Sequence, residues 1–89
     1  ESAVASNPDD VQTRLLLAAV LSSEGDGPGA IRQYEEVLRI DPDNRDAHLY
    51  LGEQYGKAGE LDKAIEILTR LTERRPKFFL ARYYLGRVL

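Results

Sequence analysis

Residues 47–76 read AHLYLGEQYGKAGELDKAIEILTRLTERRP and contain the main evidence for the fold. On both sides of Gly59 its apolar residues recur every three to four positions, which is the period of an amphipathic helix. Pro76 ends the second segment because proline cannot continue a helix. We therefore expect two helices joined by a tight turn near Gly59.

The same pattern repeats along the chain at an interval of 34 residues. Proline stands at positions 8, 42 and 76, and leucine stands at positions 17, 51 and 85. Glycine at 25 and 59 and alanine at 30 and 64 keep this interval. A unit of this length cannot bury its own apolar face, so tandem units stack into a solenoid whose extended concave surface usually binds the partner.

The repeats divide the chain into segments. Residues 11–44 form a first repeat, residues 45–78 a second, and residues 79–89 the opening helix of a third. Residues 1–10 match the closing part of an earlier unit or a lead-in to the first. Periodicity and proline positions predict five helices at roughly 9–23, 28–39, 44–57, 61–74 and 78–89. Because both ends fall inside a repeat, we expect the chain to be part of a longer array.

At this register the chain resembles the tetratricopeptide repeat (TPR) family. The family's characteristic small and large positions in residues 45–78 are Leu51, Gly52, Tyr55, Gly59, Ala64, Leu68 and Pro76. Two positions depart from the family: Leu71 stands where alanine is usual, and His48 where tryptophan is frequent. The resemblance covers nearly the whole chain. It implies an all-α fold, a right-handed α-solenoid of antiparallel helix pairs with about five helices.

Certain equivalent positions of the repeats, called columns below, are expected to pack the repeats together. They are Leu17, Ala18, Ala30, Pro42, Leu51, Gly52, Tyr55, Ala64, Pro76 and Gly86. Glycine inside a helix costs about 0.5–1 kcal/mol relative to alanine, so Gly52 and Gly86 indicate that another helix approaches closely there. In the first repeat, residues 26–29 (DGPG) replace the large residue seen as Leu61 in the second. We therefore expect a flexible helix start and a looser first repeat.

The resemblance also implies where a partner binds. Members of the family usually hold an extended peptide or a helix in the groove lined by the first helix of each repeat. Mapped by column, the candidate groove residues are Leu15, Ala19, Leu49, Tyr50, Glu53, Tyr83, Tyr84 and Arg87. The columns at which some members clamp a chaperone's C-terminal carboxylate hold apolar or tyrosine residues here, so that specificity is not expected. A groove rich in tyrosine fits a hydrophobic peptide or an amphipathic helix, although neighbouring repeats could bury part of it.

The predicted function is a non-enzymatic scaffold that binds a protein or peptide partner. The alternative is a structural module that forms homo-oligomers through its final helix. That helix would expose Leu85, Val88 and Leu89, because no second helix of its repeat follows to cover them.

Charge is distributed unevenly although the net charge is only −3. Residues 1–46 hold ten acids and four bases, whereas residues 70–89 hold one acid and six bases. This asymmetry could orient head-to-tail stacking or attract an acidic partner. Alternatively, Arg74, Arg75 and Lys77 merely offset a helix dipole at a helix C-terminus.

Several kinds of site are not expected. The chain has no cysteine and one histidine, His48, which stands in a packing column. Asp41, Asp43 and Asp46 resemble the start of a calcium loop, but the obligatory glycine is missing. We predict no catalytic residue, no metal and no cofactor. Basic and aromatic residues interleave only near the C-terminus and no apolar run reaches about 20 residues, so neither nucleic acid nor membrane is an expected partner. The cellular compartment is left open.

Overall fold

A computed structural model describes residues 10–89 of the chain. Within them the chain forms helices and turns and no strand, which confirms the all-α prediction. The helices are α2 (Val11–Ser23), α3 (Gly27–Ile40), α4 (Arg45–Lys57), α5 (Leu61–Arg74) and α6 (Phe79–Val88). Their bounds lie within two residues of those predicted from the sequence. The expected tail of an earlier unit, residues 1–10, lies almost entirely outside the described residues.

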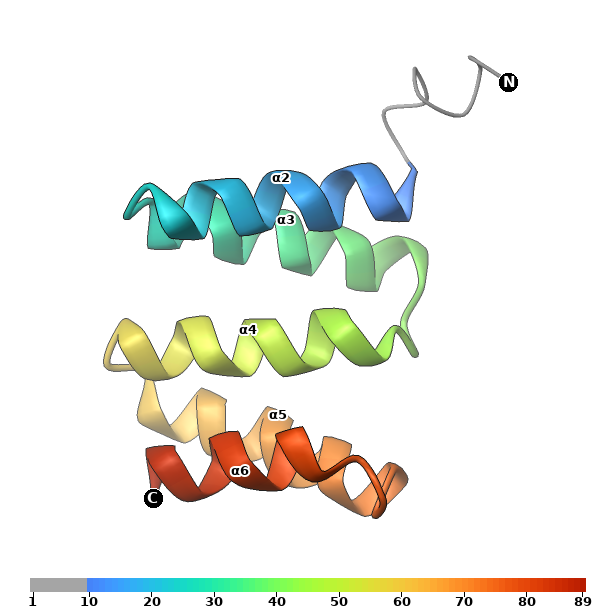
Figure 1. The fold of residues 1–89 in the computed structure, drawn as a ribbon, viewed down its shortest axis with the longest axis vertical. Coiled ribbons are helices and arrows are strands. Elements are labelled where there is room, and N and C mark those ends of the chain that lie inside the picture. Colours follow the sequence, from blue (N-terminus) through green and yellow to red (C-terminus); the bar gives the residue numbers. More distant parts are fainter. Residues whose placement is uncertain (1–9) are drawn as a thin grey trace.

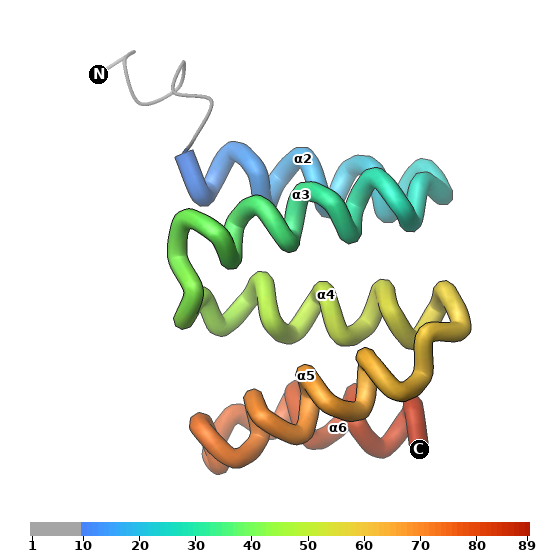
Figure 2. The backbone as a smooth tube through the Cα atoms, turned by 180° about the vertical axis from the view of Figure 1, so that it is seen from behind, coloured from blue at the N-terminus to red at the C-terminus, as the bar shows by residue number. Residues whose placement is uncertain are grey.

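The helices form two layers (Figure 1). The first helices of the repeats, α2, α4 and α6, lie on one side, and the second helices, α3 and α5, lie behind them. Figure 2 shows the opposite side, with α3 and α5 in front. Consecutive helices run antiparallel and pack on one another, and α4 also contacts α6 directly. The layer of first helices therefore forms a continuous face along the stack.

The turns between the two helices of each repeat share one geometry. Gly25 and Gly59 occupy equivalent positions and have φ angles of 84° and 82°. Residues other than glycine rarely adopt this left-handed backbone conformation, which explains why glycine recurs at this position of the repeat. The repeat interval in the sequence is therefore the interval of a repeated backbone turn.

The start of α3, expected from the sequence to be flexible, carries a side-chain cap. Asp26 caps this helix because its Oδ1 accepts a hydrogen bond of 3.0 Å from the backbone N–H of Gly29. Gly27 replaces the larger residue that the second repeat has at Leu61, yet Leu61 is itself 48% exposed. The first repeat therefore loses little core at this position.

The core consists of two clusters joined through α4. One lies between α2, α3 and α4 and the other between α4, α5 and α6. The buried residues of the first are Ala18, Ala30, Tyr34, Val37, Ala47 and Leu51, and those of the second are Leu49, Leu68, Leu71 and Ala81. Partly buried Tyr50 and Ile67 pack against both clusters, so α4 and α5 connect the repeats.

Gly52 occupies a place where two helices approach closely. A Cβ atom built at Gly52 would lie 2.7 Å from Cγ and Cδ2 of Leu68, which is fully buried. The same atom would lie 3.0 Å from Cγ2 of Ile67. The absence of a side chain at residue 52 therefore allows α4 and α5 to pack at this distance.

Two expected packing positions differ from that expectation. Leu17 is 43% exposed, and a Cβ atom at Gly86 would meet nothing within 4 Å. Leu17 and Gly86 lie on the end helices α2 and α6, which pack against fewer helices than α4 does within residues 10–89. The equivalent Leu51 and Gly52 are buried in the middle of the stack.

Candidate functional site: a groove along the first helices

A hollow of about 490 Å³ lies between α2 and α4. Its lining residues from α2 are Gln12, Leu15, Leu16, Ala19, Ser22 and Ser23. Those from α4 are Asp46, Tyr50, Glu53, Gln54 and Lys57, and Tyr34 reaches it from α3. The residues of α4 recur every three to four positions, so the helix turns one face toward the hollow.

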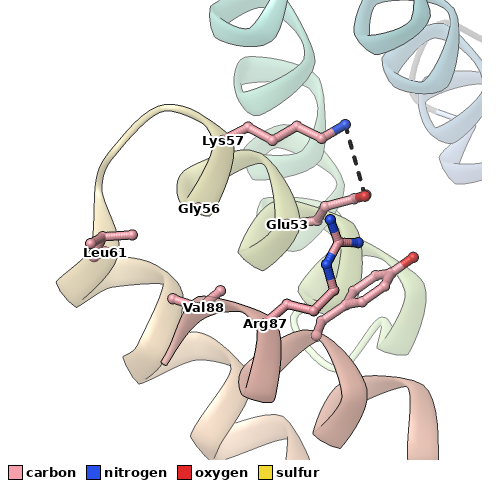
Figure 3. Close-up of a pocket in the computed structure, with 7 residues that line it drawn as sticks. Glu53, Gly56, Lys57, Leu61, Arg87 and Val88 are labelled. Carbon is pink, nitrogen blue, oxygen red and sulfur yellow. Dashed lines mark ion pairs between the residues drawn. The ribbon is translucent and has the colours of Figure 1, made fainter.

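A second hollow of about 200 Å³ lies between α4 and α6 (Figure 3). Its lining residues are Glu53, Gly56, Lys57, Leu61, Tyr84, Arg87 and Val88. Glu53 and Lys57 line both hollows, which makes them neighbours along one groove across α2, α4 and α6. We call this surface the first-helix groove.

Opposite charges meet where the two hollows adjoin. Lys57 Nζ lies 3.8 Å from Glu53 Oε2, and the two side chains are 61% and 25% exposed. Figure 3 shows Arg87 of α6 reaching toward Glu53 across the second hollow. An exposed pair one helical turn apart contributes only a few tenths of a kcal/mol. A bound partner could therefore rearrange this pair at small cost.

Tyrosines supply most of the aromatic surface of the groove. The ring of Tyr50 stacks on Tyr34, with centroids 6.1 Å apart, and Tyr83 and Tyr84 adjoin one another at 5.6 Å. Burial, with smaller contributions from Tyr50 and Glu53, raises the pKa of Tyr34 to about 12. Burial is also the main cause of the raised pKa of Tyr84. Both phenols are therefore protonated near neutral pH and can donate hydrogen bonds.

Six of the eight predicted groove residues line the two hollows. Leu15, Ala19, Tyr50 and Glu53 line the first hollow, and Tyr84 and Arg87 line the second. Tyr83 lies on the exposed surface of α6, 59% exposed, with the Arg87 guanidinium 5.9 Å from its ring centroid.

Leu49 does not lie on the groove surface. It is only 1% exposed and packs in the second core cluster with Leu68, Leu71 and Ala81. Its side of α4 faces α5 and α6, so it supports the groove from within and offers no surface to a partner.

Sequence reasoning did not identify two groove residues that join helices. Gln54 is a buried polar residue whose Nε2 donates a hydrogen bond of 2.6 Å to Oγ of Ser22. This bond links α4 to α2 below the first hollow. The available indication was that Gln54 lies one helical turn after the apolar Tyr50 and Leu51, and a buried amide needs a hydrogen-bond partner.

His48, expected to have a structural role, contacts the turn that precedes α4. A ring nitrogen of His48 lies 2.8 Å from the carbonyl oxygen of Pro42, on the side of α4 away from the groove. Within residues 10–89 no group of three or more His, Cys, Asp or Glu side chains is placed to hold a metal ion. Among the same residues no helix is both long and apolar enough to cross a membrane.

Comparison with known proteins identifies the family. The sequence profile of the Tetratricopeptide repeat family matches residues 21–87. The chain belongs to this family. Tetratricopeptide repeats are typically non-enzymatic scaffolds for protein interaction, and the two-layered stack of helix pairs agrees with that general role.

Two curated relatives and one solved structure place this TPR chain more closely. It is 33% identical over 84 residues to human Protein IFIT1 homolog B, covering 94% of this chain and 18% of that protein. It is 31% identical over 87 residues to mouse Interferon-induced protein with tetratricopeptide repeats 2, covering 97% and 18%. The chain thus spans 18% of the length of these relatives. A crystal structure of MamA matches with a TM-score of 0.83 and 25% identity, over 98% of this chain and 51% of that chain.

Proposed function

We propose that this TPR segment binds a peptide or helix of a protein partner in the first-helix groove. The observation that carries the proposal is the continuity of two hollows that share Glu53 and Lys57. A continuous concave surface across three helices suits an elongated ligand better than a compact one. Most of the residues that line the groove come from α2 and α4.

The lining favours a ligand with apolar or aromatic side chains. Leu16 lines the first hollow and is 68% exposed, so it presents a large apolar area to a ligand, and the rings of Tyr50 and Tyr84 line the two hollows. The ionisable side chains of the two hollows nearly balance, because Asp46 and Glu53 are matched by Lys57 and Arg87. Binding would therefore depend mainly on burial of apolar surface, with the charges selecting orientation.

The groove also supports a binding role in preference to a catalytic one. Burial raises the pKa of Tyr34 and of Tyr84, so these two phenols donate hydrogen bonds and do not act as bases near neutral pH. We therefore propose no enzymatic activity for this segment and no cofactor.

Ligand selection tests the proposal. A random library of displayed 12-residue peptides is selected on the immobilised chain, and the affinity of enriched peptides is then measured by fluorescence anisotropy. We expect Tyr50→Ala with Tyr84→Ala to weaken binding at least tenfold, because each substitution removes a ring from one hollow. The matched control is Arg32→Ala on the exposed surface of α3. Unchanged affinity in a folded tyrosine variant contradicts the proposal.

The second candidate function is self-association through α6. Phe79, Leu80 and Leu89 are 68%, 48% and 80% exposed, which leaves an apolar surface on the last helix. Leu85 and Val88, expected to be exposed, instead pack partly buried against the second core cluster. The solution mass measured by light scattering over a concentration series tests this function. A monomer at all concentrations rejects self-association. A dimer that the Phe79→Asp substitution converts to a monomer supports self-association.

A further inference from the structure

A chain of hollows lies on the other side of α4 from the first-helix groove. Three adjoining hollows of about 400, 290 and 510 Å³ follow α5 and the turn after it, and Arg74 lines all three. We call this surface the outer trough. Its cations are Arg45, Lys63, Arg70, Arg74, Arg75 and Lys77, and its carboxylates are Asp43 and Glu66.

Helix geometry separates this trough from the groove. The groove residues Asp46 and Glu53 each precede a trough residue, His48 and Tyr55, by two positions. At 3.6 residues per turn, two positions correspond to about 200° around the helix. The two surfaces therefore use opposite faces of α4. The trough is lined by residues of α5, the helix that lies in front of α6 in Figure 2.

Charge is concentrated in the trough. Six cations face two carboxylates there, although the whole chain has a net charge of −3 and the groove has equal numbers of each sign. The helix dipole explains cations at the end of α5, such as Arg74, but not Lys63, which lies in the first turn of that helix. The excess of positive charge thus exceeds what stabilisation of the helix end requires.

The ion pairs already present in the trough leave its arginines accessible. Arg70 Nη2 lies 2.9 Å from Glu66 Oε2, and Arg74 Nη2 lies 3.1 Å from Asp43 Oδ1. All four side chains are more than 60% exposed. Pairs this exposed are screened by water and salt, so a second carboxylate can approach the same arginines with little loss.

The spacing of the arginines matches an extended peptide. Arg70 and Arg74 lie four residues apart on α5, which is about 6 Å along the helix axis. Alternate residues of an extended chain, which point to the same side, are about 6.6 Å apart. We propose that the outer trough binds an extended acidic peptide segment whose alternate carboxylates pair with Arg70 and Arg74, while Arg75 and Lys77 extend the site.

Nucleic acid fits this surface less well. The nearest aromatic rings are already stacked by cations: Arg45 Cζ lies 4.4 Å from the centroid of Phe78, and Lys63 Nζ lies 5.5 Å from that of Tyr55. Base stacking requires open ring faces, so the trough lacks the usual platform for single strands.

The test uses a fluorescein-labelled 12-residue peptide in which Glu alternates with Ser, at 0.15 M salt. At this salt exposed charges beyond about 8 Å are largely screened, so the assay reports local contacts. We expect the chain to bind this peptide and R70E/R74E to weaken binding at least tenfold. The matched control, R32E/R82E, makes the same change in net charge at exposed positions outside the trough and should change the affinity less than twofold.

Further measurements distinguish the other outcomes. The proposal is overturned if the chain does not bind the peptide, if a peptide with Gln in place of Glu binds equally, or if the control variant weakens binding as much. Tighter binding of a 12-nucleotide single strand, lost in R70E/R74E, would identify a nucleic-acid surface instead. Circular dichroism checks folding, and R70Q/R74Q replaces R70E/R74E in the binding assay if charge reversal unfolds the chain. Y50A/Y84A should still bind the acidic peptide, so this test is independent of the groove.

Discussion

Replacing Gly52 by alanine should destabilise the fold, contrary to the usual effect of that substitution within a helix. Alanine normally gains about 0.5–1 kcal/mol over glycine in a helix interior. Here the new methyl group would lie 2.7 Å from Cγ and Cδ2 of Leu68 and 3.0 Å from Cγ2 of Ile67. Leu68 is fully buried, so it has little freedom to move away. Overpacking of a core typically costs about 1–3 kcal/mol.

At the middle of each range, the overpacking cost of about 2 kcal/mol exceeds the gain in helix propensity of about 0.75 kcal/mol, which leaves a net loss of about 1.25 kcal/mol. In a domain of this size such a loss lowers Tm by roughly 5–10 °C. Thermal unfolding followed by circular dichroism measures this shift. The matched control is Gly86→Ala, in the same repeat column, where the new Cβ meets nothing within 4 Å. It should leave Tm unchanged or raise it. Equal stabilisation by both substitutions would refute the role assigned to the contact between α4 and α5.

Two further predictions concern a helix cap and the titration of tyrosine. Asn44→Ala removes the side-chain oxygen that accepts a hydrogen bond of 2.9 Å from the N–H of Ala47, and should lower the free energy of unfolding by about 1 kcal/mol in chemical denaturation. Asn44→Asp, which keeps an acceptor, is the control. Equal losses of stability in both variants would contradict the capping role. The folded-state pKa of Tyr34 and of Tyr55 is raised from 10.0 to about 12, mainly by burial, so the stabilisation linked to these phenols is present below pH 10 and is lost as pH rises toward 12. Ultraviolet titration of phenolate should show delayed ionisation in the folded chain, and Tyr34→Phe should remove part of it; titration of all tyrosines near pH 10 would contradict the burial.

The sequence predicted the helices well because the repeat supplies the same evidence more than once. Gly25 and Gly59, 34 residues apart, mark one type of left-handed turn, and both have positive φ angles. Pro42 and Pro76 likewise mark the ends of second helices. An independent coincidence at each of these columns is improbable, so the register was secure before any side-chain packing was considered.

Side-chain exposure was harder to predict, for two physical reasons. Leu49 and Tyr50 are adjacent apolar residues of α4, and a difference of 100° around the helix decides that one is buried and the other lines the groove. Leu17 and Gly86 share columns with buried residues, but a repeat column is buried only where a neighbouring helix covers it. A column pattern identifies such a position without showing which neighbours are present.

The position of α4 in the stack explains how a short chain can present two different surfaces. This helix lies between two repeats, so its flanks are buried in both core clusters and fix its rotation. One remaining face then contributes Tyr50 and Glu53 to a groove of nearly balanced charge, and the other contributes His48 and Tyr55 to a basic trough. Because contact with Leu68 at Gly52 sets the distance of α5 from α4, the same packing that stabilises the repeat also positions the arginines of the trough. Stability and the geometry of the outer surface therefore depend on one helix contact, whereas the groove depends on the contacts of α4 with α2 and α6.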